Sequence, residues 1–118
     1  MIDVYNHIFT TLSGLGYPVR EQGSYGEHET LPETHITYFI LNQDDASHAD
    51  NQPTSTTTAV QVALYSKQPA IVQQANQTLK AIMMPAGFLR AGGRNLPFDS
   101  DTGHYGYTST YNFYDLEG

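Results

Sequence analysis

The chain has 118 residues and no cysteine, so it has room for one hydrophobic core and cannot form a disulfide, a thiolate nucleophile or a cysteine-ligated zinc site. Its apolar runs are far shorter than the about 20 residues of a membrane-spanning helix, and Asp3 stands where a signal peptide would be basic. A net charge of −7 without a Lys/Arg cluster disfavours tight binding to nucleic acid. We expect one soluble domain over residues 1–118.

The charge is unevenly distributed along the chain. All twelve acids fall in residues 1–50 or 99–118, where Arg20 is the single basic residue, whereas residues 51–98 hold four basic residues and no acid. The four are Lys67, Lys80, Arg90 and Arg94. If the fold keeps the two sets on different faces, the subunit favours head-to-tail packing between copies. The alternative is that the segregation is an accident of composition.

Residues 2–18 predict an amphipathic helix, because apolar side chains recur at helical spacing until glycine and proline stop the pattern. The stripe consists of Ile2, Tyr5, Phe9 and Leu12, widened by Ile8 and Leu15, and the stop signals are Gly14, Gly16 and Pro18. The polar, glycine-bearing residues 19–29 indicate a short strand or an irregular connection.

Two strands are predicted next, over residues 36–41 and 54–66. The first combines β-branched and aromatic side chains, and in the second apolar residues alternate with smaller or polar ones. Between them, residues 42–53 have the Asn, Asp, Ser and Pro content of a long turn. We therefore expect a charged loop that projects from the sheet, a feature that commonly meets another protein.

Residues 66–87 predict a second helix. Ser66 can cap it, Pro69 fits its first turn, and Pro85 and Gly87 end it. The apolar stripe is Ile71 or Val72, Ala75, Leu79, and Ile82 or Met83.

The last part of the chain predicts a short strand over residues 88–91, a turn-rich stretch over 92–103 and a closing strand over 104–114. Alternation in the closing strand places Tyr105, Tyr107, Tyr111 and Phe113 on one face and Thr108, Thr110, Asn112 and Tyr114 on the other. The order α-β-β-α-β-β predicts an α+β fold, with an antiparallel sheet of about four to five strands packed with two helices.

Asp44, Asp45, His48 and Asp50 suggest a hard-cation site with oxygen ligands. The EF-hand pattern fails, however, because no glycine stands at its sixth position and no glutamate closes the loop. The five histidines show no HExxH or comparable spacing. A solvated acidic loop is the favoured interpretation, and we expect no catalytic residue, no metal and no cofactor.

Several pieces of the sequence, in their order and spacing, resemble a family of small tail-completion proteins of long-tailed phages and Gram-positive prophages. The pieces are LPETHITYF, Asp44-Asp45, Ala49-Asp50-Asn51, the Thr-rich lead into VQVALYS, LKAIMMPAGF and, more loosely, Leu15-Gly16-Tyr17-Pro18-Val19. The resemblance implies a structural virion protein, not an enzyme, that caps the head-proximal end of the tail tube and joins the tail to the head connector.

The resemblance also implies the partners: copies of the chain itself in a ring, expected to be a hexamer, together with the tail-tube and head-connector proteins. DNA would pass without specific binding, and no membrane is involved. The expected location is the virion tail, and the host cytoplasm during assembly. The candidate residues for interfaces or the lumen are Asp44, Asp45, His48, Asp50, Lys67, Lys80, Arg90 and Arg94. Acids gathered on loops could line a lumen through which DNA slides.

Two other interpretations remain open. One is a different phage structural subunit, such as a tail-tube or minor capsid protein, because fold and ring symmetry can be shared while the position in the particle differs. The other is a small ligand-binding or hydrolytic α+β protein that uses the histidine and aspartate residues of the loop.

Overall fold

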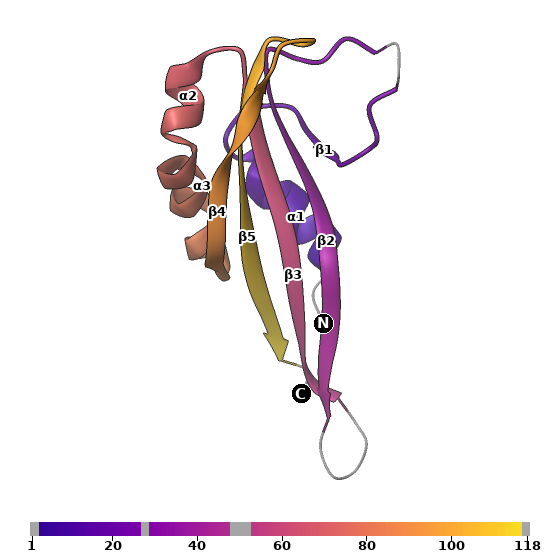
Figure 1. The fold of residues 1–118 in the computed structure, drawn as a ribbon. Helices are drawn as coiled ribbons and strands as arrows, with labels where there is room; N and C mark the ends of the chain where they lie inside the picture. Colours follow the sequence, from indigo (N-terminus) through magenta and orange to yellow (C-terminus); the bar gives the residue numbers. More distant parts are fainter. Residues whose placement is uncertain (1–2, 27–28, 48–52, 117–118) are drawn as a thin grey trace.

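A computed structural model describes residues 3–26, 29–47 and 53–116, with the backbone alone at 45–47, 53–55 and 115–116. Within these residues, helices lie against one face of a single twisted sheet (Figure 1). The elements in chain order are α1 (Val4–Ser13), β1 (Val19–Glu21), β2 (Thr34–Ser47), β3 (Pro53–Ser66), α2 (Pro69–Gln73), α3 (Ala75–Met83), the 3-10 turn η1 (Met84–Ala86), β4 (Phe88–Asp99) and β5 (His104–Leu116). The predicted α+β class is confirmed.

The sheet is mixed, so the prediction of a purely antiparallel sheet is wrong. Its described strands lie in the order β1-β2-β3-β5-β4, and all neighbours are antiparallel except β1 and β2. The parallel pair is held by Ile36 N–H to the Pro18 carbonyl at 2.9 Å and Gln22 N–H to the Tyr38 carbonyl at 2.8 Å. Residues 22–33 separate the two strands, and a connection of about a dozen residues is what a parallel return requires.

β2 continues well beyond the predicted strand, so the long loop predicted over 42–53 is wrong for residues 42–47. A bulge at Leu41 shifts the register, after which Asn42 pairs with Ala59 and Asp44 pairs with Thr57. The Gln43 side-chain amide donates to the Thr58 hydroxyl at 3.2 Å. Polar residues therefore extend the strand because the threonine-rich start of β3 gives them a complete ladder. Residues 48–52 lie outside the described part.

β4 is also longer than predicted, because residues 92–99 of the expected turn-rich stretch form strand. Leu89 pairs with Asn112 and Arg94 pairs with Thr108, with a bulge between Arg90 and Gly92. Gly92 and Gly93 thus belong to a bulged edge strand, a position where glycine is common.

The predicted second helix has the right limits but is interrupted. The Ser66 hydroxyl accepts from Gln68 N–H at 3.0 Å, Pro69 opens α2, and Gly87 ends η1 with a φ of 100°. Gln74, at φ −100° and ψ 4°, separates α2 from α3. The proline start and the glycine stop are therefore confirmed. The expected cap at Ser66 is wrong, because Gln68 is the N-cap residue of α2 and makes no side-chain capping bond, and the expected continuity is wrong as well.

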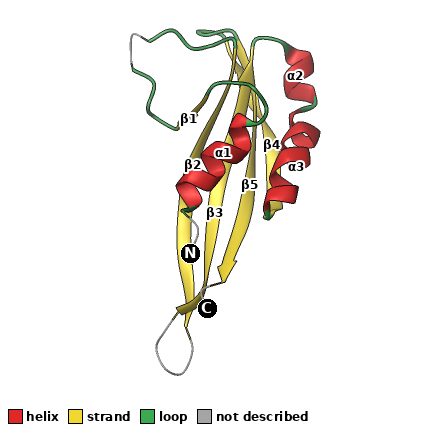
Figure 2. Ribbon diagram, turned by 180° about the vertical axis from the view of Figure 1, so that it is seen from behind, coloured by secondary structure: helices red, strands yellow, loops and turns green. Residues whose placement is uncertain are grey.

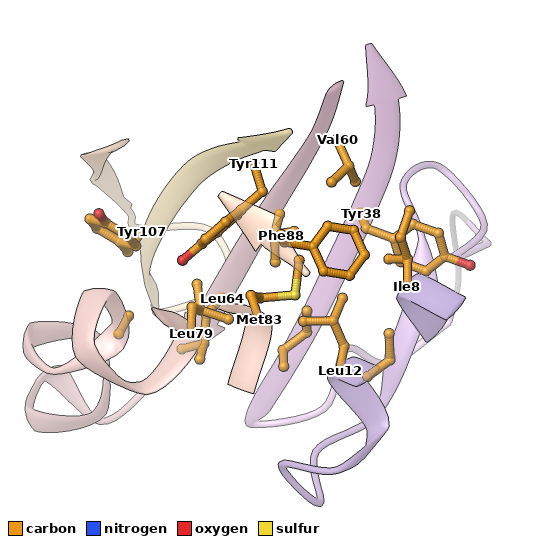
Figure 3. Packing of buried hydrophobic residues seen from close by; sticks show 14 of the residues in the cluster. Ile8, Leu12, Tyr38, Val60, Leu64, Leu79, Met83, Phe88, Tyr107 and Tyr111 are labelled. Carbon is orange, nitrogen blue, oxygen red and sulfur yellow. The ribbon is translucent and has the colours of Figure 1, made fainter. Parts of the chain in front are cut away.

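The core lies between the sheet and the helices, which cover the same face of the sheet (Figures 2 and 3). α1 contributes Val4, Ile8 and Leu12, whereas Tyr5 and Phe9 are 46% and 44% exposed. The predicted stripe was thus partly wrong: the buried one begins at Val4. The fully buried Phe88, Tyr111, Leu64, Leu79 and Met83 fill the centre of the cluster.

Among the described residues, no helix lies on the opposite side of the sheet (Figure 1). Alternation directs Thr37, Gln61, Thr108, Thr110 and Asn112 to this side, which we call the open face. The Gln61 amide donates to the Thr108 hydroxyl at 2.8 Å, which in turn donates to the Val62 carbonyl at 3.2 Å. The predicted division of the closing strand is confirmed, since Tyr107, Tyr111 and Phe113 are buried on the helix side.

Candidate assembly surfaces

Two long backbone edges of the sheet have no partner strand among the described residues. β1 pairs only with Ile36 to Tyr38, so β2 from Phe39 to Ser47 has a strand on one side alone. β4 is the last strand on the other side, over all twelve of its residues. An unpaired edge offers a row of N–H and C=O groups to another chain. β2 and β4 run in opposite directions, because three antiparallel pairings separate them.

The two basic candidates of β4 differ in how they are held. Arg90 points to the helix side, where its Nη2 donates to the Tyr107 hydroxyl at 3.0 Å, and that hydroxyl donates to Asn76 Oδ1 at 3.1 Å. Arg94 lies on the open face opposite Thr108. It lines a cleft of about 300 Å³ with Gln61, Gly92, Thr108 and Thr110, and within the described residues no hydrogen bond or ion pair holds it.

Of the acidic candidates, only Asp44 is described in full. It lies on the open face of β2 opposite Thr57, is exposed, and accepts a hydrogen bond from the Asn42 side chain at 3.1 Å. The backbone of Asp45 lies in β2, its side chain is not described, and His48 and Asp50 lie outside the described residues. In the part of the chain that the structure describes, no group of three metal-ligating side chains comes together.

Lys67 and Lys80 lie away from the β4 edge. Lys67 follows β3, where its N–H donates to the Glu33 carbonyl at 3.1 Å, and it shares a cleft of about 470 Å³ with Glu29. Lys80 lies on α3 in the helix layer. At Lys67 the basic and acidic stretches of the sequence are therefore not separated, because this residue lines a cleft together with Glu29.

Glu29 is further held by Arg20 through the ion pair between them. The hydrogen bond from Gly26 N–H is the main cause that lowers the pKa of Glu29, and Arg20 adds to it. The Arg20 guanidinium also lies 4.2 Å from the centre of the Tyr25 ring. These contacts hold the connection between β1 and β2 at the end of the sheet where β2 begins.

The open face also carries apolar side chains near its unpaired edges. Leu89 on β4 is 52% exposed and Tyr114 on β5 is 53% exposed. Leu41, at the bulge of β2, is 46% exposed. Single exposed apolar residues are ordinary, but two of these three lie on the free edge strands.

Sequence reasoning missed one constellation, the pair formed by His35 and His104. Both side chains are 4% exposed and their ring centres lie 5.0 Å apart. Both are buried on the open-face side of the sheet, outside the hydrophobic core between the sheet and the helices. Nothing in their spacing along the chain indicated a contact, because the sheet order alone brings the starts of β2 and β5 together.

None of the helices in the described residues is long and apolar enough to cross a membrane. Comparison of the chain with protein-family models and with curated proteins found no match.

Proposed function

We propose that this chain is a structural subunit that assembles with copies of itself into a ring and, in that form, completes a phage tail by capping the head-proximal end of the tail tube. The observation that carries self-assembly is the pair of unpaired strand edges with opposite charge, Arg94 on β4 and Asp44 on β2. The position at the tail rests on the sequence resemblance described above.

The shape of the subunit supports assembly. Its principal extents are 53 × 29 × 23 Å, and its radius of gyration is 15.7 Å. A compact domain of this length would have a radius of gyration of about 13.5 Å. The excess reflects β2 and β3, which extend beyond the helices (Figure 2). No helix in the described part of the chain packs against the projecting ends of these strands, so a neighbouring copy can supply their packing contacts.

Edge pairing between β4 of one copy and β2 of the next joins two different surfaces, and such a contact closes into a ring when its rotation allows. Copies related by rotation about an axis near the strand direction bring β2 antiparallel to β4, so the two edges can form an antiparallel ladder. The register that places Arg94 opposite Asp44 also places residues 91–99 opposite 39–47. It therefore uses the whole unpaired length of β2.

The same register staggers neighbouring copies. Arg94 pairs with Thr108 of β5, which pairs with Ala63 of β3, whereas Asp44 pairs directly with Thr57 of β3. The two positions on β3 are six residues apart. Six residues are about 20 Å along a strand, and four strands are about 19 Å wide, so the strands would tilt by about 45°. Closed sheets tilt by about 35–45°. Helices then lie outside, and the polar open face lines the lumen.

Paired charge reversals test this interface by sedimentation velocity. Asp44→Arg and Arg94→Asp should each reduce the assembled fraction at least about tenfold, because like charges then face each other across the ladder. The double variant should restore assembly. Lys80→Glu, which reverses a basic residue in the helix layer, is the matched control and should assemble like the unmodified chain. If both single variants assembled to the same extent as the unmodified chain, the edge interface would be refuted.

A further inference from the structure

The carbonyl oxygen of Pro32 accepts two hydrogen bonds from histidines on different strands. It lies 3.0 Å from His35 Nδ1 at the start of β2 and 2.9 Å from His104 Nε2 at the start of β5. A carbonyl oxygen can only accept, so His35 carries a proton on Nδ1 and His104 carries one on Nε2. One backbone atom thus ties the end of the β1–β2 connection to two strands that β3 separates.

The two rings are packed in a confined place. The Tyr65 ring stacks on His35 with centres 5.1 Å apart, and the Tyr25 ring meets it edge-on at 5.5 Å. His104 Nδ1 is buried without a hydrogen-bond partner among the described residues. A neutral His35 suits this arrangement. Positive charge on His35 would be buried 5.0 Å from the second imidazole.

Some nearby charged groups favour positive charge at His35 and others oppose it. The titratable and charged side chains that face the pair are Tyr25 and Glu29 of the β1–β2 connection, with Arg20 of β1 on Tyr25, Tyr65 of β3, Lys67 after it, and Asp99 at the end of β4. Glu29 is already paired with Arg20, and Lys67 opposes added positive charge. Asp99, which lines a cleft of about 230 Å³ with both histidines, would favour it. Burial remains the largest influence on His35.

We propose that His35, His104 and the Pro32 carbonyl form a pH-sensitive clasp, which holds residues 29–32 against the open face when His35 is neutral and releases them in mild acid. Release uncovers Tyr65 and the ends of β2 and β5 where they meet the connection. Only proton transfer from solvent to an imidazole nitrogen is involved, and no covalent bond changes.

The direction of the pH dependence follows from His35. Burial lowers its pKa below the usual value; the hydrogen bond to Pro32 opposes this shift, and His104 adds to it. Since the folded pKa lies below the unfolded value of about 6.5, the open state binds more protons as pH falls. The clasp is therefore at full strength above about pH 6.5 and is lost as pH falls through the folded pKa.

Site-resolved hydrogen exchange of the full chain tests the clasp between about pH 7.5 and pH 5. The reporter is the Lys67 amide, which donates to the Glu33 carbonyl next to Pro32, and the internal reference is the Gln22 amide, which donates to Tyr38. After correction for intrinsic exchange, Lys67 should lose protection relative to Gln22 by up to about tenfold for each pH unit between about pH 6.5 and the folded pKa of His35, and the loss should level off below that pKa.

Two substitutions remove titration and keep the donors. His35→Asn places an amide nitrogen near the position of Nδ1, and His104→Gln places one near the position of Nε2. The double variant should keep Lys67 protected across the pH range. His7→Gln is the matched control, because His7 Nε2 also bonds a carbonyl, that of Ala86 at 2.9 Å, in a distant part of the fold. It should retain the pH-dependent loss.

A loss of Lys67 protection that persists unchanged in the double variant would overturn the clasp, as would constant protection in the unmodified chain. If the double variant does not fold, the unmodified chain still tests the proposal. The NMR titration of the His35 ring should then share its midpoint with the changes at Leu31 and Lys67, and separate midpoints would overturn the proposal.

Discussion

Arg90 donates a hydrogen bond to the Tyr107 hydroxyl, 3.0 Å away, so this arginine of the edge strand is engaged on the helix side of the sheet. Arg94, four residues on, lies on the open face without such a contact in the described residues. The two arginines were equal candidates in the sequence. The structure gives Arg90 a part in holding β4 to α3 through Tyr107 and Asn76, so Arg94 is the arginine that we propose for the interface.

Gly93 is the position on β4 that this contact depends on. A β-carbon there would overlap the Tyr107 hydroxyl, whereas one at Gly92 would meet nothing within 4 Å. Gly93→Ala should therefore lower the free energy of unfolding by about 1–3 kcal/mol, and Gly92→Ala should change it by less than about 0.5 kcal/mol. Urea denaturation of the two variants measures both values.

A double-mutant cycle identifies the cause. Tyr107→Phe removes the hydroxyl, so Gly93→Ala should cost less in that background, with a coupling of about 1 kcal/mol. Equal costs in both backgrounds would show that the hydroxyl is not the group that excludes a side chain at Gly93.

The orientation of α1 predicts a contrast between two residues on one helix. Leu12 is fully buried, so Leu12→Ala should lower the free energy of unfolding by about 2–5 kcal/mol. Phe9 is 44% exposed, so Phe9→Ala should cost about 1 kcal/mol or less despite its larger side chain. Thermal or urea unfolding of both variants gives the comparison, and a larger loss for Phe9→Ala would mean that the helix buries the other stripe.

The buried tyrosines predict the alkaline limit of stability. Burial is the main cause that raises the pKa of Tyr38, Tyr65 and Tyr111. Each folded pKa lies above the unfolded value of about 10. The contribution of these tyrosines to the free energy of unfolding is therefore complete below about pH 10 and is lost as pH rises through the folded pKa. Absorbance titration at 295 nm should show part of the nine phenols ionising late, together with unfolding. Simple titration of all nine at about pH 10 would contradict this.

The acidic end of the β2–β3 hairpin predicts an assembly phenotype. Reversing Asp44, Asp45 and Asp50 to lysine should impair assembly or DNA passage, because the lumen of the proposed ring would gain positive charge that retains DNA. The yield of infectious particles measures the effect. Unchanged yield would contradict both the acidic lumen and the Arg94–Asp44 contact, because Asp44 is reversed in this variant.

The sequence predicted the elements better than their limits and neighbours. Pro69 and Gly87 marked the second helical region correctly, because their backbone restrictions are local. Gly92 and Gly93 suggested a turn, yet they lie in a strand, because the ladder to β5 supplies hydrogen bonds that local propensity does not reveal. The same applies to the polar residues 42–47, whose partner is the threonine-rich start of β3.

The choice between neighbouring apolar stripes was also beyond the sequence. Tyr5 and Phe9 repeat with the same period as Val4 and Ile8, one residue away on the helix surface, and periodicity alone cannot tell which stripe meets the sheet. The contact between His35 and His104 depends on the order of the strands. It could not be inferred before the β2–β3 pair and the β3–β5 pair were known.

The most direct test of ring assembly is the native mass of the unmodified chain, measured by light scattering over a concentration series at low and moderate salt. The subunit mass is 13.1 kDa. We predict a single closed species near six subunits that dissociates as salt screens the Arg94–Asp44 contact. A monomer at every concentration and salt level would contradict self-assembly through the sheet edges, and an open series of growing oligomers would contradict closure into a ring.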